Sequence, residues 1–340
     1  MVRIESEDSK FEFVISKDTK TLIRIDYKGD GIVGEITIPH SINDEVVIEQ
    51  IGASIFKEFT IDEAEPNKAI PLAINFEHGI KKVSPYVFYG CERILDIAWS
   101  DTCYEIPASL FASKNVLKLT RIDNVREIHS KAFINSIIGF LEWPKSCKEI
   151  PEGCFEGARI IGKLSGMEFV ETVEHGAFAR SSIKELCWPD KCSTIPVSCF
   201  NRSEITEIYG LENVKTIKTG AFKNSKIKSL DLSKTKVETI EAEAFAYCQH
   251  LDSVAWPSTC STIPQFCFTS SKVRRFNGFE HVTTIKQGAF WDSDLEGADL
   301  SGSPVVVIEK GAFPHHLQDK GAVIMPYYND AVDKNEIFNL

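Results

Sequence analysis

Cysteine has the most regular spacing of any residue in this sequence that could carry out chemistry. Among the ten cysteines, three C-x6-C pairs recur: Cys147/Cys154, Cys192/Cys199 and Cys260/Cys267. Such pairs could form disulfides, which persist in oxidising compartments, or bind zinc, although this spacing without a CxxC pair or histidine partners matches no usual zinc site. In the other repeats, valine mostly replaces the first cysteine and alanine the second. Because free cysteine packs as a small hydrophobe, we expect these thiols to fill the core, with intracoil disulfides as the second interpretation and zinc as the third.

No other set of residues predicts catalysis. The eight histidines stand at non-equivalent positions, and the sequence contains no repeated Ser/His/Asp or Cys/His arrangement and no P-loop. We therefore expect no enzyme, no catalytic residue, no metal and no cofactor. The alternative is a hydrolase that uses Cys187 as its nucleophile, because this thiol falls at a position predicted to be exposed.

The chain repeats a short pattern in which an aliphatic residue is followed five positions later by phenylalanine. Ten intervals from Phe88 to Phe313 cover 225 residues, a mean of 22.5 per repeat. This period falls within the range of about 20 to 29 residues of leucine-rich repeats. The twelve pairs are Ile51/Phe56, Val83/Phe88, Ile106/Phe111, Ile128/Phe133, Ile150/Phe155, Val173/Phe178, Ile195/Phe200, Ile217/Phe222, Ile240/Phe245, Ile263/Phe268, Ile285/Phe290 and Ile308/Phe313.

The period predicts a β-rich repeat solenoid, a right-handed leucine-rich-repeat stack of about eleven coils with a parallel sheet on one face. We expect residues 1–50 to form an N-terminal β cap and first partial repeat, residues 51–316 the solenoid with an acidic insertion at 57–70, and residues 317–340 a C-terminal cap. At the end of each predicted strand, large and small residues alternate, as in Trp143, Gly166, Trp188 and Gly210. We expect each indole to lie over the glycine of a neighbouring coil.

Charge and hydropathy exclude some classes of partner. The net charge of −11 and the lack of a Lys/Arg stripe argue against nucleic-acid binding. No apolar run is long enough to cross a bilayer, and residues 1–10 are too acidic and polar for a signal peptide. We therefore expect a monomer without membrane insertion in the cytoplasm, or at the cell surface or secreted if a leader is removed.

The outward positions of the predicted strands form a continuous face on which residue types are free of packing constraints. Aromatic and arginine residues there resemble the residues that dominate protein interfaces. The candidate partner-binding residues are Phe140, Glu185, Glu207, Tyr209, Asp231, Arg274 and Arg275. The convex loops are the competing location. Tyr209 and Phe140 could also stack on sugars, so a carbohydrate or cell-wall binding module is the alternative function.

Several motifs together resemble the BspA-like leucine-rich repeats. These are the I-x-x-x-A-F coil, the I-x-x-I-x-W-P strand, and the opening Ile36–Pro39 followed by Val46–Gly52. The resemblance implies a non-enzymatic protein-binding scaffold, because the family's named members are adhesins that bind extracellular-matrix proteins or other bacteria. It therefore implies a protein partner, either a host, matrix or other cell-surface protein.

Overall fold

The chain folds as a β-solenoid of about eleven turns with parallel sheets and little helix, as the repeat period predicts. The computed structural model describes residues 1–6, 10–28, 34–42, 46–56, 72–89, 91, 94–325 and 336–339. The chain divides into two compact units, Met1–Phe169 and Val170–Leu340. The acidic insertion expected at 57–70 lies outside the described residues.

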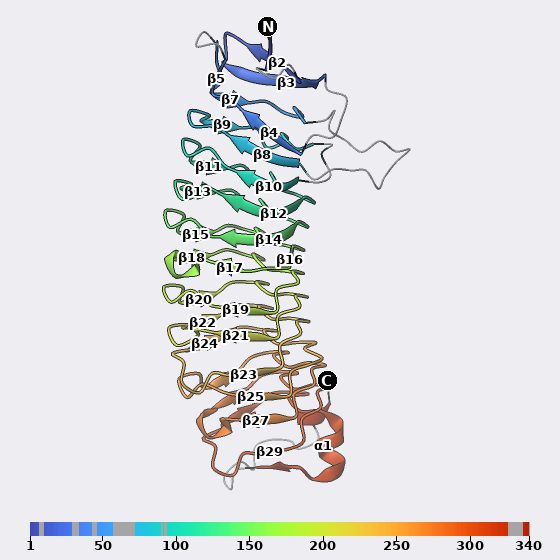
Figure 1. Cartoon of the computed structure of the whole chain (residues 1–340). Helices are drawn as coiled ribbons and strands as arrows, with labels where there is room; N and C mark the ends of the chain where they lie inside the picture. The colour runs from blue at the N-terminus through green and yellow to red at the C-terminus, as the bar shows by residue number, and fades with distance from the viewer. Residues whose placement is uncertain are drawn as a thin grey trace, which may run out of the picture. The chain divides into compact units, whose positions relative to one another are not determined.

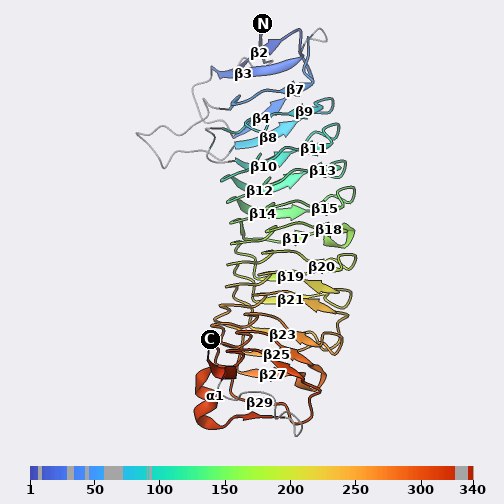
Figure 2. The ribbon, with the colours of Figure 1, turned by 180° about the vertical axis from the view of Figure 1, so that it is seen from behind.

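The first unit combines an antiparallel hairpin with a parallel ladder of strands, which lie side by side in both ribbon views (Figures 1 and 2). Strand β2 pairs with β1 and β3 in antiparallel fashion. On its other side β3 pairs in parallel with β7, which pairs in parallel with β9. The longer strands form one sheet in the order β16-β14-β12-β10-β8-β4, with β17 also paired to β14. The elements of the first unit are β1 (Val2–Glu5), β2 (Phe11–Ser16), β3 (Thr21–Tyr27), β4 (Glu35–Ile38), β5 (Ser41–Ile42), β6 (Val46–Val47), β7 (Gln50–Ile51), β8 (Leu72–Phe76), β9 (Lys82–Val83), β10 (Ile94–Ala98), β11 (Glu105–Ile106), β12 (Asn115–Thr120), β13 (Glu127–Ile128), β14 (Ile137–Glu142), β15 (Glu149–Ile150), β16 (Arg159–Ile160), β17 (Leu164–Ser165) and the 3-10 helix η3 (Met167–Phe169).

In the second unit the paired strands lie on two parallel faces. One face carries β19-β21, β23-β25-β27 and β29-β31, and the other carries β20-β22-β24 and β26-β28-β30. The elements are β18 (Thr172–Val173), β19 (Glu185–Cys187), β20 (Thr194–Ile195), β21 (Glu207–Tyr209), β22 (Thr216–Ile217), β23 (Ser229–Asp231), β24 (Thr239–Ile240), β25 (Ser253–Ala255), β26 (Thr262–Ile263), β27 (Arg275–Asn277), η4 (Phe279–His281), β28 (Thr284–Ile285), β29 (Ala298–Asp299), β30 (Val307–Ile308), α1 (His315–Lys320), β31 (Val323–Ile324) and η5 (Glu336–Phe338).

The repeated phenylalanines stack ring upon ring along each unit. In the first unit, neighbouring ring centroids from Phe56 to Phe155 lie 5.2 to 5.7 Å apart. In the second unit, the spacing from Phe178 to Phe313 is 5.1 to 5.9 Å. These are ordinary separations for packed aromatic rings, and the rings are buried. The stack is therefore the spine of each core.

The turns around most of the repeated phenylalanines contain left-handed backbone conformations. Around Phe200, for example, Ser198 has φ 53° and Arg202 has φ 58°. Non-glycine residues adopt this conformation at a cost of roughly 1–2 kcal/mol, which explains why glycine fills the position in the recurring Gly-Ala-Phe sequence. The turn also hydrogen bonds to the next coil, since the Phe200 amide donates to the carbonyl of Ala221 at 2.7 Å.

The tryptophans and glycines contact each other differently from the sequence expectation. A Cβ on Gly166 would lie 2.4 Å from the main-chain oxygen of Trp143, and one on Gly210 would lie 2.8 Å from that of Trp188. The prediction that the indole lies over glycine is therefore wrong, because it is the tryptophan main chain that leaves no room for a side chain. Each indole instead packs against the phenylalanine of its own coil, as Trp188 does on Phe200 at 5.9 Å.

The indole nitrogens of the buried tryptophans also form hydrogen bonds with the main chain of nearby cysteines. Trp99, Trp143, Trp188 and Trp256 each donate a hydrogen bond from Nε1 to the carbonyl of the cysteine four residues later, at 2.8 to 3.2 Å. A buried indole needs such a partner. The W-P-x-x-C sequence is therefore one structural unit.

The cysteines of the three C-x6-C pairs are buried free thiols, as their exchange with valine and alanine predicts. Burial raises the pKa of Cys192 to about 12 and that of Cys199 well above its ordinary value. A thiol that is buried and protonated is a poor nucleophile. Cys187, in contrast, is exposed.

Replacing Phe200 with alanine should lower the free energy of unfolding by about 3–5 kcal/mol, because it removes a fully buried ring from between Phe178 and Phe222. Urea unfolding followed by circular dichroism measures this change. The exposed Tyr247, at 43% exposure, provides the control, and its alanine variant should unfold almost like the wild type. Equal midpoints for wild type and Phe200→Ala would contradict the assignment of the stack as the spine.

Iodoacetamide should label the folded protein at Cys187 and leave the three C-x6-C pairs unmodified, because burial shields those thiols. Peptide mass spectrometry after labelling, with and without urea but without reductant, measures this. In urea, both cysteines of each pair should become labelled. Pairs that stay unlabelled in urea until a reductant is added would show that they are disulfides.

Candidate functional site

The strand face of the second unit is the outward side of strands β19, β21, β23, β25 and β27. Residues on these strands alternate, so that Leu186, Leu230 and Val254 are buried while their neighbours point outward. The outward residues that define the strand face are Glu185, Cys187, Glu207, Tyr209, Ser229, Asp231, Ser253, Ala255, Arg275 and Asn277. Five of the seven predicted binding residues belong to this face, and Arg274 immediately precedes it.

Tyr209 stands among carboxylates on β21. The ladder pairs Glu185 with Glu207 and Cys187 with Tyr209, and the Tyr209 hydroxyl donates a hydrogen bond to the Glu207 carboxylate. This hydrogen bond, together with the nearby negative charges, raises the pKa of Tyr209. Like charges on adjacent strands are unfavourable for the sheet, and the Tyr209 side chain is 51% exposed. This arrangement places an aromatic surface and two carboxylates where stability alone would not require them.

Asp231 adds a further negative charge to the same face. Its Oδ1 accepts hydrogen bonds from the Ser233 hydroxyl at 2.6 Å and the Ser233 amide at 3.0 Å. These bonds lower the pKa of Asp231, which stays ionised at neutral pH. The carboxylate is therefore held in one orientation at the end of β23.

The two predicted arginines share one carboxylate. Arg275 forms an ion pair with Asp252, and Nε of Arg274 lies 4.0 Å from Oδ1 of the same residue. All three side chains are partly exposed, so each pair contributes little stability. The basic spot that the sequence indicates is thus partly offset by an acidic residue one coil earlier.

Phe140 belongs to the first unit. It lies on β14 opposite Lys118 of β12 and is 41% exposed. The other six candidate residues lie in the second unit. A binding site built from the second unit alone does not include Phe140.

Cys187 does not have the contacts of an activated nucleophile. Its Sγ lies 4.0 Å from the Trp188 carbonyl oxygen, to which the thiol donates a weak hydrogen bond. Activation of a thiol requires a partner that stabilises the thiolate, and a carbonyl oxygen does not do so. Among the described residues, no three His, Cys, Asp or Glu side chains form a group that could hold a metal ion.

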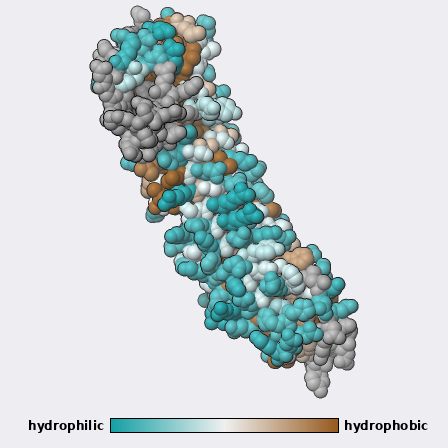
Figure 3. Space-filling view, turned by 90° about the vertical axis from the view of Figure 1, so that its right-hand side faces the viewer, coloured by the Kyte–Doolittle hydropathy of each residue, from teal (hydrophilic) through white to brown (hydrophobic). Residues whose placement is uncertain are grey.

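On the side of the molecule that Figure 3 shows, the C-terminal part is mostly polar. Large apolar patches are a common mark of interfaces, so that mark is missing from the side in view.

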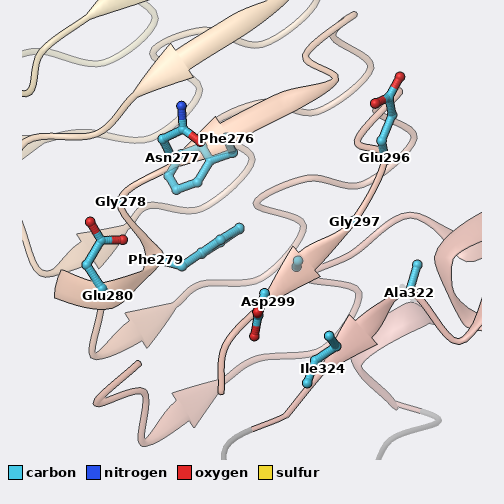
Figure 4. A pocket seen from close by; sticks show the side chains of 11 residues that line it. Phe276, Asn277, Gly278, Phe279, Glu280, Glu296, Gly297, Asp299, Ala322 and Ile324 are labelled. Atoms are coloured by element: carbon cyan, nitrogen blue, oxygen red, sulfur yellow. The ribbon is translucent and has the colours of Figure 1, made fainter. Parts of the chain in front are cut away.

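Sequence reasoning missed a groove beside β27. It has a volume of about 640 Å³ and lies between β27 and β29, with Phe276, Phe279, Glu280, Glu296 and Asp299 among its lining residues (Figure 4). One signal in the sequence could have revealed it. The inward strand position that holds Leu186, Leu230 and Val254 in earlier coils changes from phenylalanine at 276 to alanine at 298.

No helix in the described part of the chain is long and apolar enough to cross a membrane.

Comparison with known proteins relates the chain to leucine-rich repeat proteins. The family model described as "BspA type Leucine rich repeat region (6 copies)" matches residues 35–162 and 171–296. A leucine-rich repeat protein from Bacteroides ovatus is similar in structure at 14% identity and a TM-score of 0.51, covering 90% of this chain and 84% of that one. A leucine-rich cell surface protein from Faecalibacterium prausnitzii aligns at 15% identity and a TM-score of 0.46, covering 99% and 97%. A comparison with curated proteins found no significant match.

Proposed function

The chain belongs to the BspA-type leucine-rich repeat family, and from this we propose that it is a non-enzymatic, adhesin-like scaffold that binds a protein partner through the strand face of its second unit. The observation that carries the proposal is the half-exposed Tyr209 on β21, whose hydroxyl donates a hydrogen bond to the Glu207 carboxylate. Tyrosine is among the residues whose truncation most weakens protein interfaces.

Rigid placement supports this role. Strands β19 and β21 are joined in register, so Glu185, Glu207 and Tyr209 keep their spacing before a partner arrives. A surface that is already ordered loses little conformational entropy when it binds. Tyrosine adds a large contact area with few rotatable bonds.

The charge of the face indicates the character of the partner. Glu185, Glu207 and Asp231 lie on neighbouring strands, and the chain as a whole carries a net charge of −11. A basic surface on the partner would complement these carboxylates and speed association at low ionic strength. The partner that fits is therefore a basic protein.

Location follows the family. Proteins of this family are typically found at the cell surface, and the cytoplasmic location expected from sequence has no support in the comparisons. We propose display at the cell surface as a monomer, where the partner is a host, matrix or other cell-surface protein. Ionic interactions with such a partner would weaken as salt rises.

Tyr209→Ala should weaken binding of the partner about 30-fold, because truncating an interface tyrosine of this kind costs on the order of 2 kcal/mol. The partner is first identified by capture from extracellular-matrix extract on the immobilised wild-type protein. Its dissociation constant is then measured with purified components by biolayer interferometry. Glu207→Lys should also weaken binding and reduce its dependence on salt.

Tyr247→Ala is the matched control, since Tyr247 is an exposed tyrosine of the same unit that does not belong to the strand face. It should bind the partner as the wild type does. Equal affinity in Tyr209→Ala and Tyr247→Ala would move the site away from the strand face. Binding to glycan arrays together with failure to retain any protein would favour the carbohydrate-binding alternative.

A further inference from the structure

The parallel ladder of the second unit stops at β27 and starts again at β29. Strands β23, β25 and β27 are continuous, and β29 pairs with β31. Just before these strands the two coils are still joined, because the Glu296 amide donates to the Arg274 carbonyl at 3.0 Å. Beyond this bond, no ladder joins β27 to β29 in the described part of the chain. The coils therefore part along the length of the strands.

Hydrogen-bonding groups of the main chain face the resulting gap. The Arg275 amide donates to Asp252 and the Asn277 carbonyl accepts from Trp256, so these two residues face β25. Successive residues of a strand point their amide groups to opposite sides, and Phe276 therefore faces β29. By the same reasoning Asp299 faces β27, because the amides of Ala298 and Leu300 donate to Ala322 and Ile324.

Side-chain volume accounts for the separation. Phe276 packs 4.5 Å from Phe279 and 5.2 Å from Phe290, measured between ring centroids. The next coil places the small residues Gly297 and Ala298 along the groove. Gly278, with φ 116°, turns the chain out of β27 into η4. Large rings on one side and small residues on the other leave the groove seen in Figure 4.

The groove combines an apolar wall with an acidic rim. Phe276 and Phe279 provide the wall, and Glu280, Glu296 and Asp299 bring carboxylates, while no lysine or arginine belongs to its described lining. Hydrogen bonds from Ser301 lower the pKa of Asp299, so that carboxylate stays charged. Its volume of about 640 Å³ lies within the range of ligand sites.

We propose that this groove docks an extended, lysine- or arginine-containing peptide segment of the protein partner, which adds as a strand to the free edge of β27. The proposal rests on the protein-binding role and specifies the chemistry of the partner. A free strand edge is a template for a further strand. The aromatic wall accepts apolar side chains or the stems of basic ones, and the rim carboxylates attract their charged ends.

A second break in the ladder serves as an internal comparison. Strands β21 and β23 are likewise not paired with each other, and Gly210, which has a positive φ, directly follows β21. There the coils carry Ile208 and Leu230 at the inward position, which are similar in size. The groove described here is distinguished by the change from Phe276 to Ala298.

Synthetic peptides test the proposal on the whole 340-residue chain. The probe is a fluorescein-labelled, capped octapeptide of alternating lysine and valine, and its binding is followed by fluorescence anisotropy. We expect saturable binding that weakens at least tenfold when alternate amides are N-methylated, since this removes the donors needed for strand pairing. A peptide with glutamate in place of lysine should not bind.

Variants assign the binding to the groove. Glu296→Lys should weaken binding of the lysine peptide at least tenfold, while Glu212→Lys, an equal charge change at an exposed site elsewhere in the unit, should leave it unchanged. Gly297→Leu, which adds volume without charge, should also abolish binding. A Cβ at position 297 meets only the Ala322 carbonyl oxygen, at 3.4 Å, so this variant should fold, as circular dichroism would verify.

The outcomes separate this proposal from the one before it. Equal loss in Glu296→Lys and Glu212→Lys, unchanged affinity of the N-methylated peptide, or no saturable binding of the lysine peptide would each overturn docking in the groove. Tyr209-dependent capture of a protein partner would survive all of these results. Conversely, peptide binding that Tyr209→Ala leaves intact, with no protein captured, would support the groove and count against the strand face.

Discussion

Stacking of one phenylalanine on the next fixes the geometry on which the rest of each unit depends. A ring spacing of 5.1 to 5.9 Å in the second unit is close to the distance of about 4.8 Å between neighbouring strands. One ring per coil therefore holds consecutive coils at a separation where their main chains can hydrogen bond. The left-handed residues on either side, such as Ser198 and Arg202 around Phe200, bend the chain so that the ring points inward. The spacing of the outward side chains on neighbouring coils therefore follows from this stacking.

Sequence alone predicted those features that repeat. The period gave the solenoid, and exchange of cysteine with valine and alanine placed Cys154 and Cys199 in the core. Contacts between particular atoms, which residue size does not determine, could not be predicted from the sequence. The hydrogen bond from the Trp188 indole to the Cys192 carbonyl is one example. The contact of Gly210 with the Trp188 main chain, in place of the indole, is another.

The candidate site was predictable to a smaller extent for the same reason. Alternation along a strand identifies which residues face outward, and Glu185 and Tyr209 lie where it puts them. It does not say which charges meet between coils, so the pairing of Arg275 with Asp252 was not foreseen. The groove arises from a mismatch between Phe276 and Ala298, two residues that are unremarkable when each is considered in its own repeat.

Hydrogen bonds between coils have a mechanical consequence when the chain is pulled from one end. Bonds such as those from Phe200 to Ala221 and from Phe222 to Ala244 join each coil to the next. Tension applied to the chain end would load them one coil at a time, as in unzipping, instead of loading all of them together. Each coil that peels away would release 22 or 23 residues, about 75 Å of extended chain. Successive releases would dissipate a sudden pull while the remaining coils stayed folded.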